Sequence, residues 1–348
     1  MKDFQLNRLV RDNIRTLAPY SSARSEFSGH ASVWLDANES PFNSPYNRYP
    51  DPLQREVKKR LERVKGVPAS QIFLGNGSDE CIDLVYRVFC EPKTDNVVAI
   101  SPTYGMYEVC ADINDVEYRK VPLADGFSID TDALLAATDA HTKVIWICSP
   151  NNPTGGAFSH ADITKVLSAF SGIVVVDEAY SDFSSVESMR LSLDNHPNLL
   201  VMQTFSKAWG CASVRLGMAF ASEAIISLFN KVKYPYNVNL LTQQFALRQL
   251  DRLDEMQKWV STLLSERTRL IQNLRELPQV VKIFHTDANF VLARVTDADG
   301  IYFHLQQQGI IVRNRNKVEK CLGCLRITVG NEEENNALIN GIKSYGAK

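Results

Sequence analysis

Short apolar runs alternate with amphipathic stretches through the middle of this chain. Brief apolar runs of this kind suit strands that are buried on both faces of a sheet. The expected strands are 72–75, 96–101, 116–121, 143–148, 172–177, 199–205 and 216–221. The expected helices between them include 79–90, 104–113, 130–137 and 159–170. The alternation predicts an α/β domain with a seven-stranded, mostly parallel sheet.

The pattern changes after about residue 237. A long, charge-rich helical stretch is expected over 241–277, and it is followed by a second set of short elements. The expected strands there are 281–284, 290–295, 310–313 and 325–329, with helices at 299–308 and 332–344. These elements predict a smaller α+β domain. We expect a large domain at 36–245 and a small domain that combines 1–35 with 246–348, closely docked because no low-complexity linker separates them.

The composition narrows the class of protein. The chain has 348 residues, of which 45% are hydrophobic and 22% charged, enough for two domains with sizeable cores. A net charge of -2 gives no basic footprint for nucleic acid or a membrane surface. No apolar run approaches the roughly 18 residues of a membrane-spanning helix. The polar N-terminus predicts no signal peptide, so we expect a cytoplasmic protein.

Cysteine usage agrees with a reducing compartment. There are seven cysteines, an odd number, and most lie in apolar runs, which favours free thiols over a disulfide framework. Cys321 and Cys324 form a CxxC motif with no second pair near it in sequence. A zinc or redox use therefore stays open beside a plain turn leading into a buried strand. No metal site is predicted.

One lysine is the most informative residue for function. Lys207 comes just after the expected strand 199–205, with Ser206 before it and Arg215 eight residues later. An isolated lysine after a strand is ordinarily a solvated surface amine. Ligands of open parallel sheets, however, bind at the carboxyl ends of strands. A lysine there, beside phosphate-binding donors, can form the Schiff base that holds pyridoxal phosphate (PLP).

An acid and a tyrosine stand at the end of another expected strand. Asp177 ends the apolar run 172–177, and Tyr180 follows three residues later. A carboxylate at that point is either a helix N-cap or a functional group. Facing a pyridinium nitrogen, it would keep the ring of PLP protonated. Tyr180 could donate to the ring's phenolate oxygen.

Two turns add candidate donors. Residues 75–80 (Gly-Asn-Gly-Ser-Asp-Glu) follow a strand and open a helix, whose N-terminus offers amides to an anion. Glu80 stands where a dinucleotide-binding fingerprint needs its third glycine, which disfavours a dehydrogenase. Residues 149–156 form a second strand-end turn, in which Asn152 is either a simple turn residue or a donor aimed into the site.

Together these segments resemble the aspartate-aminotransferase superfamily, which consists of PLP enzymes of fold type I. The motifs SPNNPTG (149–155), DEAY (177–180), SK (206–207) and a later arginine occur in that family's order. The resemblance implies that Lys207, Asp177 and Tyr180 are catalytic. It implies further cofactor contacts by Tyr104 stacking on the ring, by Asn152 on the ring oxygen, and by a phosphate cup of Gly77, Ser78, Asp79, Ser206 and Arg215.

Within the superfamily, nearly the whole chain resembles the histidinol-phosphate aminotransferases. The motifs that carry this likeness are VRDNI (10–14), LAPY (17–20), LDANESP (35–41), NRYPDP (47–52) and GIIVR (309–313). The resemblance implies that Tyr20, Arg313 and Arg326 hold the substrate phosphate, with Asn152 beside them. Arginine suits this task because its planar fork binds oxyanions at two points. Tyr49 would reach the cofactor phosphate of a neighbouring subunit, which implies a homodimer.

The activity implied is conversion of imidazole-acetol phosphate and glutamate to histidinol phosphate and 2-oxoglutarate, a step of histidine biosynthesis. Transamination of aromatic amino acids and decarboxylation of threonine phosphate use the same scaffold, and motifs alone do not separate them. A regulatory protein that has lost catalysis is disfavoured, because Lys207, Asp177, Tyr180 and Arg215 are all present.

Overall fold

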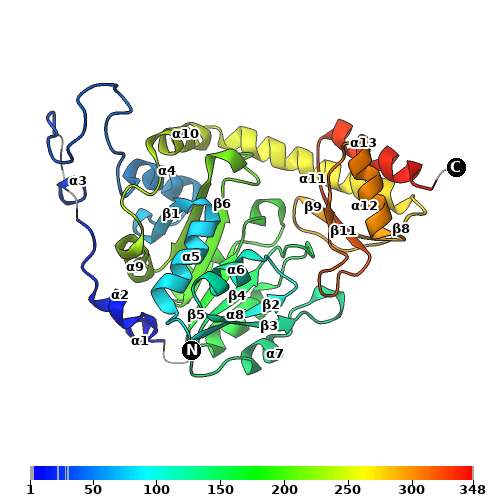
Figure 1. The fold of residues 1–348 in the computed structure, drawn as a ribbon, viewed down its shortest axis with the longest axis horizontal. Coiled ribbons are helices and arrows are strands. Elements are labelled where there is room, and N and C mark those ends of the chain that lie inside the picture. Colours follow the sequence, from blue (N-terminus) through cyan, green and yellow to red (C-terminus); the bar gives the residue numbers. More distant parts are fainter. Residues whose placement is uncertain (1–3, 22, 28, 30, 347–348) are drawn as a thin grey trace.

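A computed structural model describes residues 4–21, 23–27, 29 and 31–346. Seven strands form the sheet of the large domain in the order β1-β7-β6-β5-β4-β2-β3 (Figure 1). Their bounds are β1 (Ile72–Asn76), β2 (Asn96–Ser101), β3 (Glu117–Pro122), β4 (Thr142–Cys148), β5 (Ile173–Asp177), β6 (Leu199–Thr204) and β7 (Leu216–Ala221). β7 runs antiparallel to β1 and β6, and the other neighbours are parallel. The predicted seven-stranded, mostly parallel sheet is confirmed.

Helices cover both faces of this sheet. In β5, Val174 and Val176 face one apolar core, while Ile173 and Val175 face the other, as the two-residue period of a strand requires. The first core is closed by α4 (Arg55–Lys65), α7 (Thr131–Ala136), α8 (His160–Ala169) and α10 (Leu240–Leu250). The second is closed by α5 (Gly77–Phe89), α6 (Met106–Ile113) and α9 (Glu223–Val232). Burial on both faces explains why the strands read as continuous apolar runs.

Five short 3-10 turns complete the large domain. They are η1 (Ala69–Gln71), η2 (Asp125–Phe127), η3 (Ser181–Phe183), η4 (Met189–Asn195) and η5 (Ala212–Val214). Two of them follow strands that carry site residues, because η3 begins just after Tyr180 and η5 ends just before Arg215. Tyr180 and Arg215 are therefore each held at one end of a short 3-10 turn.

The N-terminal segment packs against the large domain, whereas the sequence analysis grouped residues 1–35 with the small domain. Its helices are α1 (Leu6–Leu9), α2 (Asp12–Thr16) and α3 (Ala23–Glu26). Val10 and Ile14 are buried in the core that contains α5 and α9. The Arg11 amide also donates to the Val88 carbonyl of α5 at 3.1 Å. Two apolar side chains thus anchor the segment at the opposite end of the molecule from the small domain (Figure 1).

The small domain is an antiparallel sheet with three helices. Its elements are α11 (Leu253–Arg275), β8 (Val280–Ile283), β9 (Phe290–Val295), α12 (Ala298–Gln307), β10 (Arg313–Asn314), β11 (Cys324–Thr328) and α13 (Glu332–Ser344). The strand order is β10-β11-β9-β8. The single expected helix over 241–277 is two helices, and α10 packs on α4 of the large domain. α11 begins against the large-domain core, where Met256 and Val260 are buried, and ends in the small-domain core with Leu270 and Leu274 (Figure 1).

Two findings limit the classes of site. No helix among the described residues is long and apolar enough to cross a membrane. Nor do three or more His, Cys, Asp or Glu side chains gather as metal ligands in the described part of the chain. Cys321 and Cys324 are buried free thiols packed beside Leu292. The CxxC motif is thus part of a turn whose second cysteine begins β11.

Candidate active site

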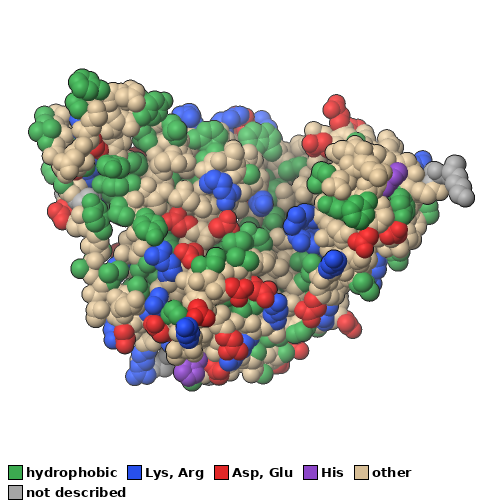
Figure 2. Space-filling model, in the orientation of Figure 1, with side chains coloured by type: hydrophobic (Ala, Val, Ile, Leu, Met, Phe, Trp, Pro, Cys, Tyr) green, Lys and Arg blue, Asp and Glu red, His purple; other side chains and the backbone are tan. Residues whose placement is uncertain are grey.

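A cavity of about 660 Å³ lies at the carboxyl ends of the central strands, where the two domains meet. In Figure 2, basic side chains from both domains stand near this junction. Most of the predicted site residues line the cavity. They are Ser78, Asp79, Tyr104, Asn152, Asp177, Tyr180, Ser206, Lys207 and Arg215 from the large domain, and Arg313 and Arg326 from the small domain. Residues far apart in sequence therefore converge on one site.

Asp177 is a buried carboxylate at the tip of β5. Its Oδ2 accepts a 2.6 Å hydrogen bond from the Tyr107 hydroxyl, and its Oδ1 accepts one from the Ala179 amide at 3.1 Å. Burial raises the pKa of Asp177, whereas the Tyr107 hydrogen bond and the positive charge of Lys207 act in the opposite direction. Since it also lines the cavity, Asp177 can pair with a cationic ring nitrogen there.

Lys207 offers a free amine to the same cavity. In the described part of the chain, its Nζ has no hydrogen-bond or ion-pair partner, and it lies 5.6 Å from the ring centre of Tyr180. Burial lowers the pKa of Lys207, and the nearby Arg326 guanidinium adds to this effect. A lowered pKa increases the share of neutral amine, which is the form that attacks a carbonyl or takes up a proton.

The first turn of α5 and Arg215 form a polar pocket beside the lysine. The Arg215 Nη2 lies 3.1 Å from Asp79 Oδ2, and the Tyr104 hydroxyl donates to Asp79 Oδ1 at 3.2 Å. The first amides of a helix have no carbonyl one turn earlier, so those of Ser78 and Asp79 suit an anion. The free end of the helix and the guanidinium thus face one pocket.

Gly77 was predicted to bind the cofactor phosphate, but its position in the structure does not match that role. It does not line the cavity, and its amide donates to the Arg215 carbonyl at 2.7 Å. Its φ of 73° is in the region that favours glycine. A Cβ at this position would stand 2.6 Å from Arg215 Nη2. Glycine is therefore needed so that Arg215 can approach, and its amide is already used.

At the site, the turn 149–156 of the large domain contacts the small domain. Asn152 is buried, and its Oδ1 accepts a hydrogen bond from Arg326 Nη1 of β11. The neighbouring Asn151 accepts from the Thr103 hydroxyl at 2.9 Å and donates to the Pro102 carbonyl at 2.9 Å. Asn151 thus holds together the two loops that carry Asn152 and Tyr104, while Asn152 faces the small domain.

Arginines form the small-domain wall of the cavity. Arg313 of β10 and Arg326 of β11 are register partners in adjacent antiparallel strands. The Arg326 guanidinium carbon lies 5.3 Å from the ring centre of Phe290. Burial lowers the pKa of Arg326. Two cations placed directly opposite each other destabilise a sheet unless an anion joins them, so this wall is suited to an acidic ligand.

The residues present fit pyridoxal phosphate. The group needs an amine for its aldehyde, a carboxylate for its ring nitrogen and donors for its phosphate. Lys207 has the unpartnered amine, Asp177 the buried carboxylate, and the α5 N-terminus with Ser206 and Arg215 the donors. Tyr104 and Tyr180 line the same cavity.

Two predicted tyrosines lie outside this chain's own cavity. Tyr20 is 71% exposed and Tyr49 is 52% exposed, and neither lines the cavity. Tyr49 stacks on Tyr236 with 4.5 Å between ring centres. Both belong to the described residues of 17–50 (17–21, 23–27, 29 and 31–50), which we call the N-terminal arm. For Tyr20 this differs from the expected phosphate contact, whereas Tyr49 was expected to serve a neighbouring subunit.

Two residues that serve the site were missed in the sequence. Tyr107 supports Asp177, but it reads as an ordinary core aromatic because it is fully buried and stacks on Trp146. Arg315 lines the cavity two residues after Arg313, and that two-residue spacing was the available signal.

The comparisons with known proteins agree with this geometry. The model of the family "Aminotransferase class I and II" matches residues 25–342. The chain belongs to this family. Its relatives within the family include the histidinol-phosphate aminotransferase of Bacteroides fragilis (strain YCH46), which is 59% identical over 341 residues, covering 98% of this chain and 99% of that protein. The predicted family is confirmed.

Solved structures of aminotransferases share the fold. The histidinol-phosphate aminotransferase from Clostridium acetobutylicum has a TM-score of 0.80 at 22% identity, covering 86% of this chain and 91% of that one. The enzyme from Sinorhizobium meliloti, solved in complex with pyridoxal-5'-phosphate, has a TM-score of 0.79 at 23% identity, covering 88% and 89%. Membership of the aminotransferase family implies that this chain, too, depends on PLP.

Proposed function

We propose that this aminotransferase converts imidazole-acetol phosphate and glutamate to histidinol phosphate and 2-oxoglutarate. The observation that carries the proposal is the pair Arg313 and Arg326, placed opposite each other on the wall that faces Lys207. A phosphate or a carboxylate bound there would direct the rest of the substrate toward the amine. The name of the relative that is 59% identical points to the same substrates. We place the reaction in the cytoplasm, since all seven cysteines are free thiols.

The proposed chemistry assigns separate tasks to the large-domain residues. When bound, PLP withdraws electrons and makes the Cα–H bond of an attached amino acid acidic. Lys207 holds the cofactor, and its freed Nζ then moves the proton to and from the substrate Cα. Asp177 keeps the proton on the ring nitrogen, because its carboxylate is buried and supported by Tyr107. Tyr180 and the Asn152 amide would hydrogen-bond the ring oxygen, and Tyr104, which lines the same cavity, would cover the ring.

The small-domain arginines bind the acidic end of each substrate. Transamination occurs in two halves at one site, so the same wall must accept a phosphate from histidinol phosphate and a carboxylate from glutamate. Arginine can bind both because its fork donates two parallel hydrogen bonds. Asn152 fixes the orientation of Arg326 through their hydrogen bond.

The substrate range tests this proposal. With 2-oxoglutarate as acceptor, kcat/KM should be highest for histidinol phosphate, and at least about tenfold lower for histidinol, because losing one charge-assisted contact costs about 1.5–3 kcal/mol. Phenylalanine and tyrosine should also be poorer substrates. Equal values for histidinol and its phosphate would contradict the phosphate pocket. Release of carbon dioxide from threonine phosphate would favour a decarboxylase instead.

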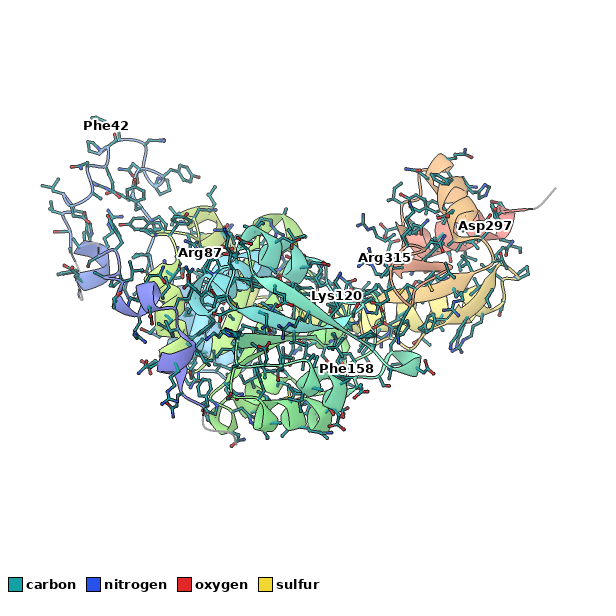
Figure 3. All side chains as sticks on the ribbon, turned by 60° about the horizontal axis from the view of Figure 1, so that its bottom comes forward. Phe42, Arg87, Lys120, Phe158, Asp297 and Arg315 are labelled. Carbon is teal, nitrogen blue, oxygen red and sulfur yellow. The ribbon has the colours of Figure 1, made fainter. Side chains whose placement is uncertain are left out.

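We also propose that the enzyme acts as a homodimer with shared sites. The N-terminal arm exposes large apolar side chains, including Leu35 at 90% and Phe42 at 77%. Exposed apolar surface of this extent is typical of an interface. Figure 3 shows Phe42 at the far end of the molecule from Arg315, so the arm lies well away from its own chain's cavity. A second copy of the chain would cover the arm and receive Tyr49 at its cofactor phosphate.

Mixed dimers test the shared site. The variants Lys207→Ala and Tyr49→Ala should each have weak activity alone. If Tyr49 serves the partner, a mixed dimer has one site with both lesions and one site with neither. Subunit exchange should then restore activity at the intact site. If Tyr49 serves its own chain, each site keeps one lesion, so no recovery after demonstrated exchange would contradict the intersubunit role.

A further inference from the structure

A third arginine is fixed in the same wall of the cavity by an alternating segment. Residues 313–316 read Arg-Asn-Arg-Asn. Asn314 Nδ2 donates to Asp299 Oδ1 at 2.6 Å, and Asn316 Nδ2 donates to Asp299 Oδ2 at 2.9 Å. One carboxylate of α12 therefore holds both asparagines on one side. Since side chains alternate along an extended segment, the two arginines face the other way, and both line the cavity.

Backbone contacts fix Arg315 beside the other two arginines. Its amide donates to the Cys324 carbonyl at 2.9 Å, which continues the pairing of β10 with β11 beyond the register pair Arg313 and Arg326. Figure 3 shows Arg315 on the side of the small domain that looks toward the large domain. Asn316 Oδ1 also accepts from the Gly323 amide at 2.8 Å, which closes the turn behind it. The position of Arg315 is thus set by hydrogen bonds on both sides.

The three guanidinium groups lack an anionic partner. In the part of the chain that the structure describes, none of Arg313, Arg315 and Arg326 forms an ion pair. Arg315 is half-buried, and its Nε and that of Arg326 are buried without a hydrogen-bond partner. Burial, followed by the charges of Arg326 and Arg313, lowers the pKa of Arg315. Two partly desolvated cations, Arg315 and Arg326, beside the exposed Arg313 are costly unless a ligand supplies the missing negative charge.

We propose that Arg315 distinguishes the substrate's phosphate from the side-chain carboxylate of glutamate, a role that rests on the proposed function. A carboxylate has one charge and two oxygens, which Arg313 and Arg326 can satisfy. A phosphate ester has a charge of about -1.5 to -2 at pH 7 and three terminal oxygens. Its extra oxygen and charge match the third guanidinium. Arg315 therefore contributes mainly in the half-reaction that uses the phosphorylated substrate.

The test compares both half-reactions of the holoenzyme in Arg315→Gln. We expect kcat/KM for histidinol phosphate to fall at least about 30-fold, mainly through KM, and to fall at least about ten times more than kcat/KM for glutamate. Arg315→Lys keeps the charge but not the fork, so its loss should be intermediate. Lys317→Gln is the matched control, because it removes one positive charge from the same segment at an exposed residue outside the cavity lining. It should change neither half-reaction.

Inorganic phosphate gives a second readout, because it competes with glutamate for the same wall. Its inhibition constant should rise at least about tenfold in Arg315→Gln and stay unchanged in Lys317→Gln. Equal losses with both substrates, or no loss with histidinol phosphate, would overturn the role of Arg315. The proposed function fails differently: the unsubstituted enzyme would then not prefer histidinol phosphate over histidinol.

Discussion

Replacing Lys207 with alanine should lower turnover by at least about four orders of magnitude, which corresponds to about 5.5 kcal/mol of lost barrier lowering. The residue has two tasks in the proposed reaction, holding the cofactor and moving the Cα proton, and alanine performs neither. Its amine is unpartnered in the described structure and faces the cavity. Single-turnover rates for each half-reaction measure the loss directly.

Chemical labelling identifies the lysine independently of rate. Borohydride reduction of the holoenzyme followed by digestion should place the pyridoxyl label on Lys207, and a label on another lysine would refute the assignment. Lys233 is the matched control, because burial also lowers its pKa but it lies outside the cavity lining. Lys233 should stay unlabelled in the unsubstituted enzyme, and Lys233→Ala should keep turnover per folded enzyme within about threefold.

Replacing Asp177 with asparagine should lower both half-reaction rates about 10³-fold, or about 4 kcal/mol. The amide keeps the side-chain volume and can still contact Tyr107, but it has no charge to retain the ring proton. Cofactor binding should therefore survive while the rates collapse. Absorbance of the bound cofactor measures cofactor binding, and stopped-flow kinetics measures the half-reaction rates. Near-normal rates would mean that another group protonates the ring.

The adjacent acid and the pH profile give controls for this result. Glu178→Gln changes a buried carboxylate that is held by Ser188 and the Met189 amide, outside the cavity lining. It should lower Tm while turnover per folded enzyme stays within about threefold. Burial raises the pKa of Asp177, whereas a cationic ring nitrogen paired with the carboxylate would lower that pKa. The rate should fall as pH falls through that pKa, and the asparagine variant should lack this step.

The large domain was predictable because its signals are local. Strands buried on both faces are continuous apolar runs, and β2 and β7 have the bounds that the pattern predicts. Errors arose where tertiary packing decides. Val10 and Ile14 could pack on any apolar surface, and the sequence does not say that α5 and α9 provide it. Likewise, the break between α10 and α11 leaves the helical periodicity almost unchanged, so the two were read as one helix.

The site was predictable where a residue follows a strand, and less so where geometry is nonlocal. Asp177 and Lys207 stand at strand ends, so the sheet alone brings them together. Tyr107 could not be found, since only the fold brings its hydroxyl to Asp177. The sequence predicted that the Gly77 amide would bind the ligand. The amide instead donates to the Arg215 carbonyl, and this contact forms only because the fold brings the start of β7 beside α5. Arg315 was overlooked because its orientation depends on Asp299, on a separate helix.

The continuous helix α11 has a mechanical consequence. Its 23 residues span about 34 Å at 1.5 Å per residue, so it is a stiff rod that joins the domain with Lys207 to the domain with Arg313 and Arg326. A tilt of about 5° where the rod begins shifts its far end by about 3 Å, roughly the length of one hydrogen bond. Because Met256 and Val260 of α11 are buried in the large-domain core, and Leu270 and Leu274 in the small-domain core, this one helix sets the spacing between the two walls of the site.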